Sequence, residues 1–301
     1  MPVNPQLDLV VRVGCRLRYQ AAAEVTVMMN LKPRMDPFQV VQQEKLSLGE
    51  RLPCEEFEDA HGNILYRLTL QPGFNEISHD ALVLVPSVAD NFHHGNDQPV
   101  ALGELPVHLL RYTLPSRYCD SDKLLNFAWE KFGHVPRGHL QVKAVCDWIH
   151  SNIEYRFGSG RSDTSASDII AQGFGVCRDF AHCGVALCRA LNLPTRYVTG
   201  HLPDIGYVDP GSPMDFHGYF EVYLGGRWFA YDPRYNVPRI GRVKVACGAD
   251  AVDCAFATIY GPLALSYFEV WAYQVAPGTV SVGDPIDLSK RLDGAIELRR
   301  A

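Results

Sequence analysis

The chain has 301 residues, of which 47% are hydrophobic and 21% charged, the composition of a folded globular protein with a large core. Its 28 basic and 34 acidic side chains give a formal net charge of −6, and no basic run stands out, so we exclude nucleic acid and anionic membranes as main partners. Because no basic start precedes an apolar stretch and no apolar run could span a bilayer, we expect neither a signal peptide nor a membrane segment.

Alternating apolar residues predict β-strands in the first third of the chain. Over Leu7–Tyr19 the apolar side chains fall on odd positions, a period typical of a strand with one buried face. The alternation recurs over 25–31 and 64–70, and the continuous apolar run 81–85 indicates a more buried strand. Repeated short strands predict an antiparallel β-sandwich domain over residues 1–105.

Residues 86–115 are rich in Pro, Asn, Asp, Gly and His, and we interpret them as a linker to a second domain, residues 106–301. The pair His93 and His94 could bind a metal ion, but no carboxylate or thiol cluster lies beside it in sequence. We therefore expect a solvated loop there, and we predict no metal and no cofactor for the chain.

Helical spacing begins after the linker. Apolar residues follow the i, i+3, i+4, i+7 pattern at Leu125, Ala128, Trp129 and Phe132. This pattern predicts a helix with Ser121 or Asp120 as its N-cap. A similar spacing over 142–153 predicts a second helix, and Ser165 with Asp168 forms a capping-box pattern that would start a third.

The run 173–182 reads Gly-Phe-Gly-Val-Cys-Arg-Asp-Phe-Ala-His and places Cys177 where a Gly-rich turn enters a helix. An apolar stripe predicts that this helix continues to about Leu191, before Asn192-Leu-Pro194. The unpaired N–H groups at a helix start favour a thiolate, which is a strong nucleophile.

A predicted hairpin supplies partners for this thiol. Two strand-like runs, one beginning at His217 and one ending at Asp232, are joined by Gly225-Gly226. With a two-residue loop, Tyr219 faces Asp232, so the histidine and the aspartate are diagonal neighbours on one face of the sheet. The aspartate would accept a hydrogen bond from one ring nitrogen, and the other nitrogen would be free for the cysteine.

Each of these residues has an ordinary structural role open to it: a cysteine in a helix is usually core, a histidine opening a strand is usually satisfied at the surface, and an aspartate before proline usually belongs to a turn. The order cysteine, histidine, aspartate, together with the hairpin register, favours a joint catalytic role.

Three motifs resemble those of the transglutaminase-like superfamily: Gly175–His182, Asp215–His217 and Trp228–Pro233. The chain is most similar to bacterial transglutaminase-like proteins that are assigned as cysteine proteases, and Tyr112–Tyr118 adds a looser similarity. This resemblance implies an α+β fold, in which an N-terminal antiparallel β-sandwich precedes a papain-like core of helices packed on an antiparallel sheet.

The resemblance also implies that Cys177 is the nucleophile, His217 the general base and Asp232 the orienting acid. Many relatives carry His-Ala-Trp where this chain has His217-Gly-Tyr219. We expect this departure to change the shape of the pocket while the chemistry is kept.

The oxyanion hole is expected to use the backbone N–H of Cys177, with Gln172 or Tyr155 as candidates for the second donor. Arg178 and Asp179 are interpreted as first-turn residues that face solvent or pack, and an acid there suits a helix N-terminus. The run 173–175 lacks the third glycine and the preceding strand of a dinucleotide loop, which excludes nucleotide binding there.

These features predict a thiol-dependent acyl-transfer enzyme that acts on a peptide or carboxamide bond of a protein or peptide substrate, through a thioester that water resolves. Transamidation by an amine, a non-catalytic peptide-binding scaffold and a metal site made of Cys177, His217 and Asp232 remain alternatives. The other eight of nine cysteines are expected to be buried core residues in a reducing compartment, which predicts a cytoplasmic location.

Overall fold

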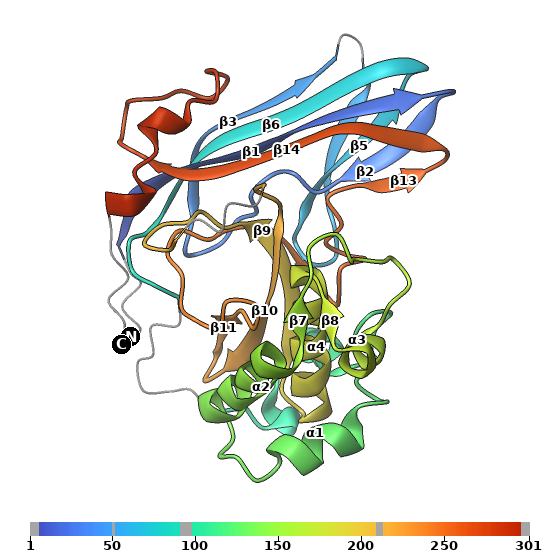
Figure 1. The fold of residues 1–301 in the computed structure, drawn as a ribbon, viewed down its shortest axis with the longest axis vertical. Helices are drawn as coiled ribbons and strands as arrows, with labels where there is room; N and C mark the ends of the chain where they lie inside the picture. The colour runs from blue at the N-terminus through green and yellow to red at the C-terminus, as the bar shows by residue number, and fades with distance from the viewer. Residues whose placement is uncertain (1–5, 50–51, 91–97, 209–212, 296–301) are drawn as a thin grey trace.

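The computed structural model describes residues 6–49, 52–90, 98–208 and 213–295. It is an α+β structure in which a β-sandwich lies above a smaller antiparallel sheet that is covered by helices (Figure 1). The predicted fold class is thereby confirmed. None of the described helices is long and apolar enough to cross a bilayer.

The sandwich consists of two four-stranded antiparallel sheets, with strand orders β14-β1-β6-β3 and β13-β2-β5-β4. Its strands are β1 (Leu7–Ala21), β2 (Val25–Met29), β3 (Val40–Leu48), β4 (Cys54–Glu58), β5 (Ile64–Leu70), β6 (Gly73–Pro86), β13 (Thr258–Tyr260) and β14 (Leu263–Val275). Apolar side chains from both sheets form one buried cluster, which includes Leu17, Val27, Leu68 and Ile77. Burial of such a shared face is what the alternating pattern provides.

The strand β1 departs from the expectation of one buried face. Its odd positions from Leu9 to Tyr19 are buried as predicted, but Val10 and Arg12 are buried as well. The segment after β14 covers this second face, where Val280 packs near Val10 and the backbone oxygen of Asp284 accepts a hydrogen bond from Arg12. The arginine is neutralised by Asp80 at 2.8 Å, which makes its burial tolerable.

The sandwich takes strands from both ends of the chain. Strand β14 pairs with β1, and β13 pairs with β2, although both C-terminal strands belong to the part of the sequence expected to form the second domain. The division at residue 105 stays a prediction, while the sandwich itself includes strands well beyond it.

The remaining elements lie in the linker, in the lower part and, for the last two 3₁₀ turns, in the segment after β14. These are the 3₁₀ turns η1 (Leu102–Glu104), η2 (Val107–Thr113), η3 (Leu288–Lys290) and η4 (Asp293–Ala295), the helices α1 (Leu125–Phe132), α2 (His139–Asn152), α3 (Ala166–Gln172) and α4 (Cys177–Ala190), and the strands β7 (Glu154–Tyr155), β8 (Phe174–Gly175), β9 (Thr195–His201), β10 (His217–Leu224), β11 (Arg227–Tyr231) and β12 (Val243–Gly248). The last four strands form an antiparallel sheet in the order β11-β10-β9-β12.

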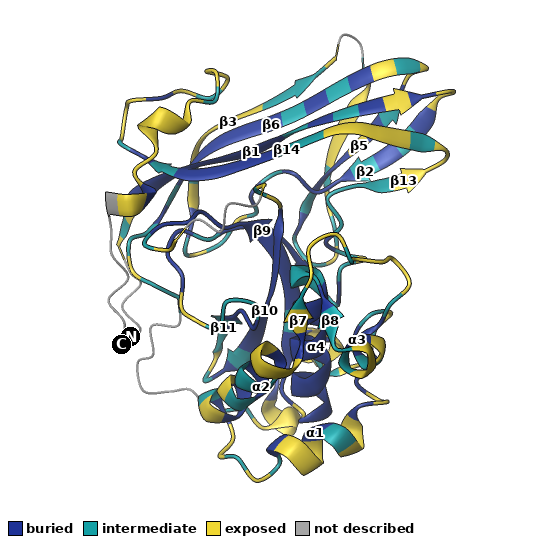
Figure 2. Cartoon of the chain, viewed as in Figure 1, coloured by how far each residue is buried: buried dark blue, intermediate teal, exposed yellow. Residues whose placement is uncertain are grey.

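Helix α4 packs directly on this sheet and is buried along almost its whole length (Figure 2). A Cβ atom at Gly184 would lie 2.2 Å from the ring of Phe220 on β10, so only glycine allows this close approach. The predicted apolar stripe of the helix is buried as expected. The helix ends before Asn192, whose positive φ of 59° turns the chain toward β9.

The predictions for the helix starts have mixed outcomes. The capping box is confirmed, because the Ser165 backbone N–H donates to Asp168 at 2.9 Å at the start of α3. The predicted cap of α1 is wrong: Leu124 occupies that position and no side chain caps it. Asp120 instead accepts from the Ser167 backbone N–H at the start of α3. Asp120 thus caps a helix that begins 46 residues later, and local sequence spacing cannot predict such a contact.

All nine cysteines are free thiols. Seven of the eight assigned to the core are buried. Cys54 is the exception: it is exposed, because it opens β4, the edge strand of its sheet. The predicted loop at His93 and His94 lies outside the described residues.

Candidate functional site

Cys177 is the first residue of α4, as the sequence predicts. The short parallel pair β7 and β8 leads into this helix start. The Asp179 carboxylate accepts a hydrogen bond from the Val176 backbone N–H at 3.0 Å, which fixes the first turn. Asp179 is therefore a buried packing residue rather than a solvent-facing one. The amide of Cys177 has no acceptor within the helix, because the first four N–H groups of a helix lack one.

The hairpin of β10 and β11 has the predicted register. Leu224 pairs with Arg227 across a two-residue loop in which both glycines have positive φ. His217 opens β10 and Asp232 directly follows β11, and the His217 Nε2 atom lies 2.7 Å from Asp232 Oδ2. Two residues that are 15 positions apart in sequence are thus in direct contact through the hairpin geometry.

Asp232 is held as a carboxylate. The side chains of Asp232 and His217 are 2% and 6% exposed, and the Arg242 Nη2 atom lies 2.9 Å from the same Oδ2 atom. Burial would raise the pKa of Asp232, but the charges and hydrogen bonds of His217 and Arg242 lower it far below its usual range. Since an ionised carboxylate can only accept, the Nε2 atom of His217 carries a proton and donates it in this bond.

The other face of the imidazole serves the thiol. Burial would raise the pKa of the Cys177 thiol, but the His217 side chain, chiefly, and the Gly218 backbone N–H outweigh this effect, and the pKa lies below its ordinary value. Burial lowers the pKa of His217, but Asp232 and Cys177 reverse this effect and raise it. A thiolate next to an imidazolium is therefore favoured.

Cys177 differs in this respect from the rest of the cysteines. Burial raises the pKa of each of the other eight, including that of the exposed Cys54, where the charge of Glu56 adds to the effect. The predicted nucleophile is thus the one thiol whose pKa is lowered.

Cys177 and His217 line a cavity of about 900 Å³. Tyr155 lines the same cavity, and the Cys177 charge acts on its hydroxyl. Gln172 is not among the residues that line it, and its side chain bonds instead to the Phe174 backbone oxygen at 2.8 Å. Of the two residues considered for the second oxyanion donor, the structure brings only Tyr155 to the cavity.

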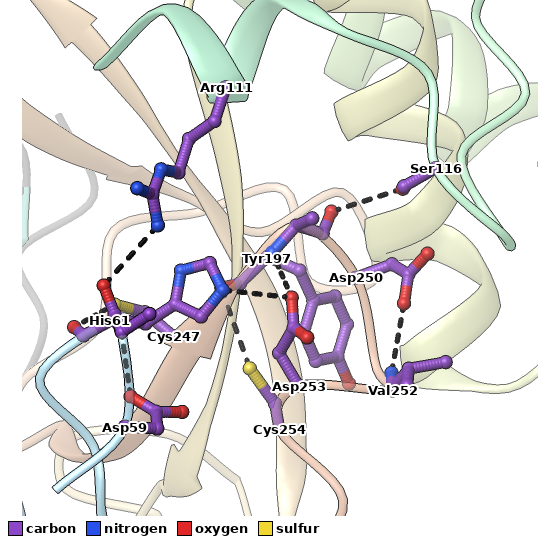
Figure 3. Close-up of polar contacts among 12 residues, drawn as sticks. Asp59, His61, Arg111, Ser116, Tyr197, Cys247, Asp250, Val252, Asp253 and Cys254 are labelled. Atoms are coloured by element: carbon purple, nitrogen blue, oxygen red, sulfur yellow. Dashed lines mark hydrogen bonds and ion pairs between the residues drawn. The ribbon is translucent and has the colours of Figure 1, made fainter. Parts of the chain in front are cut away.

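One wall of the cavity is the loop that follows β12, which includes Ala251, Cys254 and Phe256. Figure 3 shows how this loop is anchored: Asp253 lies 3.3 Å from His61, which belongs to a turn of the sandwich. The neighbouring turn is closed by a hydrogen bond from the Val252 backbone N–H to Asp250 at 2.9 Å, also drawn in Figure 3. The sandwich therefore holds part of the cavity wall.

Sequence reasoning missed two groups at this site. Arg242, the partner of Asp232, lies in the irregular segment before β12, where no periodicity or spacing marks it. The Gly218 backbone N–H is invisible to an argument from side chains, although it follows directly from the strand that places His217.

Comparisons with known proteins now bear on this site. The family model of the transglutaminase-like superfamily matches residues 133–233, a range that includes Cys177, His217 and Asp232. The crystal structure of a protein described as a "putative cysteine protease", from Cytophaga hutchinsonii, has 34% sequence identity and a TM-score of 0.81. That match covers 89% of this chain and 91% of the other. The chain belongs to the transglutaminase-like superfamily.

The curated relatives match this chain over shorter stretches. An uncharacterized protein of Mycobacterium leprae is 32% identical over 125 residues, which are 40% of this chain and 44% of that protein. An uncharacterized protein of Mycobacterium tuberculosis is 33% identical over 61 residues, 20% of this chain and 19% of that protein. The chain thus matches less than half the length of either. The resemblance of the three motifs to the transglutaminase-like superfamily is confirmed, and the activity at the site is a separate question.

Proposed function

We propose that this protein is a thiol-dependent acyl-transfer enzyme that hydrolyses peptide or carboxamide bonds, with Cys177, His217 and Asp232 as its catalytic triad. The observation that carries the proposal is the contact of Asp232 with His217 at 2.7 Å, together with the position of His217 and Cys177 in the wall of one cavity of about 900 Å³, where His217 lowers the pKa of the thiol. A nucleophile, a base and an orienting acid in contact are the requirements of this chemistry.

The resting state is a thiolate and imidazolium pair. Asp232 stabilises the imidazolium and fixes the ring so that Nδ1 faces Cys177. The two titrations are coupled, because each charged form stabilises the other. The lowered pKa of Cys177 and the raised pKa of His217 both favour this charged pair over the neutral thiol and imidazole.

Acylation begins when the Cys177 sulfur attacks the carbonyl carbon of the substrate. A carbon–sulfur bond forms and the carbonyl electron pair moves to oxygen, which becomes an oxyanion. The oxyanion then re-forms the carbonyl, the carbon–nitrogen bond breaks, and the Nδ1–H of His217 protonates the departing amine. The product is a thioester on Cys177 and a neutral imidazole.

The oxyanion is stabilised by two donors in this proposal, the backbone N–H of Cys177 at the helix start and the hydroxyl of Tyr155. Burial raises the pKa of Tyr155, so its hydroxyl keeps its proton over the range in which the thiolate exists. Such donors act on charge that appears only during the reaction, which is where stabilisation accelerates it.

Deacylation uses water. His217 removes a proton from a water molecule as its oxygen attacks the thioester carbon, and the carbon–sulfur bond then breaks to release an acid and return the thiolate. A protein or peptide substrate is proposed because the cavity is large and open enough to hold several residues. We also propose that the reaction occurs in the cytoplasm, where nine free thiols would remain reduced.

The test of this proposal is selective alkylation. At a limiting dose of iodoacetamide in mildly acidic buffer, Cys177 should be labelled far faster than Cys54, which is exposed but has a raised pKa. Peptide mapping by mass spectrometry measures both sites in one sample. Labelling of Cys54 ahead of Cys177 would contradict the assignment of Cys177 as the nucleophile and favour a non-catalytic scaffold.

Turnover is tested on a dye-labelled casein digest, with and without an added primary amine. Hydrolysis should release new carboxyl ends at a rate that the amine does not change, and Cys177→Ala should abolish it. Incorporation of the amine in place of water would identify a transamidase. Zinc bound at one atom per chain would instead favour the metal-site alternative.

A further inference from the structure

The cavity that contains Cys177 also contains a cation without an acidic partner. Arg234 lines this cavity, two residues after Asp232 in the sequence. Among the residues that the structure describes, its guanidinium forms no hydrogen bond and no ion pair; its contacts are with aromatic rings. A guanidinium with five free donors at a substrate cavity is a ready site for an anion.

Two tyrosines hold this guanidinium in place. Its central carbon lies 3.7 Å from the ring centre of Tyr155 and 4.8 Å from that of Tyr235, and both rings line the same cavity. Stacking on aromatic faces restrains the guanidinium and leaves its N–H edges available. The guanidinium N–H donors are therefore already positioned, and a ligand would lose little side-chain entropy of Arg234 on binding.

The other two arginines of the cavity form hydrogen bonds within the protein. Arg178 bonds to Asp179 at 2.9 Å, and Arg117 donates to the backbone oxygen of Ser162. Of the three arginines that line the cavity, Arg234 is the one for which the described residues supply neither a hydrogen bond nor an ion pair.

The acids of the cavity do not neutralise Arg234 either. Asp204 pairs with Arg239 at 3.2 Å. Asp215 accepts a hydrogen bond from the neighbouring Phe216 backbone N–H; burial raises its pKa and the charge of Arg234 lowers it, but among the described residues the two form no ion pair. The positive field of Arg234 consequently reaches the nucleophile, where it helps to lower the pKa of Cys177.

We propose that Arg234 is a carboxylate-binding subsite, and that the substrates are peptides or amides with an acidic group, such as a glutamyl or aspartyl side chain, close to the scissile carbonyl. This inference rests on the proposed function, because it assigns the substrate class of the same cavity. A bidentate carboxylate pair would form without breaking any existing ion pair of the protein, and it would place the substrate carbonyl next to Cys177.

The test compares two alkylating reagents of similar size, anionic iodoacetate and neutral iodoacetamide. The ratio of their rates at Cys177, divided by the same ratio for free cysteine, measures attraction of a carboxylate to the site and cancels changes in thiolate fraction. Arg234→Gln should lower this ratio about tenfold and Arg234→Glu about a hundredfold. Each factor of ten corresponds to about 1.4 kcal/mol of binding free energy. Arg67→Gln is the matched control, since Arg67 is exposed on the sandwich, pairs with Glu55 and does not line the cavity.

A second measurement needs no variant. N-acetylglutamate α-amide, which has a free side-chain carboxylate, should slow iodoacetamide labelling of the unmodified protein more than N-acetylglutamine amide does. If Cys177 is reactive but neither measurement depends on charge, or if Arg67→Gln changes the ratio as much as Arg234→Gln, the subsite is refuted while the proposed function stands. If Cys177 is unreactive, both fall together.

Discussion

Removal of the Arg242 side chain should raise the basicity of His217 while it weakens the fold. The Arg242 Nη2 atom and the His217 Nε2 atom bind the same oxygen of Asp232, at 2.9 and 2.7 Å. The Nε atom of Arg242 binds Asp90 at 2.5 Å, so the arginine joins the buried Asp232 to the partly buried Asp90. It competes with the imidazolium for one carboxylate, and its charge repels the charge that His217 must carry.

The size of this effect follows from the two bond lengths. Because both nitrogens contact one oxygen, they lie within about 5.6 Å of each other, and two unit charges at that distance repel by about 3 kcal/mol at an effective dielectric constant of 20. Arg242→Met removes this repulsion, so the pKa of His217 should rise further. The same change removes the ion-pair partner of Asp90 and one of the two partners of Asp232, which should cost about 3–5 kcal/mol of unfolding free energy.

The assay is an NMR titration of ¹⁵N-labelled imidazole in the Cys177→Ala background, where His217 titrates without the thiol. Arg196→Met is the control, because the Arg196 side chain is only 12% exposed, pairs with Glu221 at 2.6 Å and does not contact Asp232. It should destabilise the protein comparably and leave the His217 midpoint unchanged. A midpoint that stays constant or falls in Arg242→Met, in protein with native circular dichroism, would refute the reasoning.

Three further predictions concern the oxyanion, the hairpin and the fold. Tyr155→Phe should lower kcat about a hundredfold and leave iodoacetamide labelling of the nucleophile unchanged; equal loss in both assays would argue against an oxyanion donor. Gly218→Ala would place a Cβ atom 2.6 Å from the Tyr197 hydroxyl, so it should cost about 1–3 kcal/mol in thermal unfolding, whereas Gly103→Ala, with open space around it, should be neutral. Burial opposes ionisation of Glu221, but its cationic partners lower its pKa to about 2. The stabilisation of the fold by ionised Glu221 is therefore complete above the unfolded pKa of about 4.5 and is lost as the pH falls toward 2. In Glu221→Gln, the unfolding free energy should lack this dependence on pH.

Features encoded by neighbouring residues could be predicted from the sequence. The capping box of Ser165 and the start of α4 at Cys177 depend on contacts within one helical turn. The contact of His217 with Asp232 spans 15 positions, but the two-residue loop converts that gap into a fixed register. For this reason the contact between His217 and Asp232 could be predicted from the sequence.

Features that depend on distant segments could not be predicted in this way. Burial of Arg12 requires Asp80, on the paired strand β6, and the backbone near Asp284, which follows β14. Arg242 and Arg234 lie in irregular chain that has no period to reveal which way a side chain points. Their roles follow from what the completed fold places around them, a carboxylate in one case and two tyrosine rings in the other.

The β-sandwich is best understood as part of the candidate site. His61, in a sandwich turn, holds Asp253 in the loop that forms a cavity wall, and Thr258, the first residue of β13, lines the cavity itself. The chain runs from that wall directly into the strand that pairs with β2, so a shift of the sandwich would move the wall relative to Cys177 on α4. The position of the sandwich thus determines the shape of the space in which an acyl group could be held, while α4 and the hairpin supply the reacting groups.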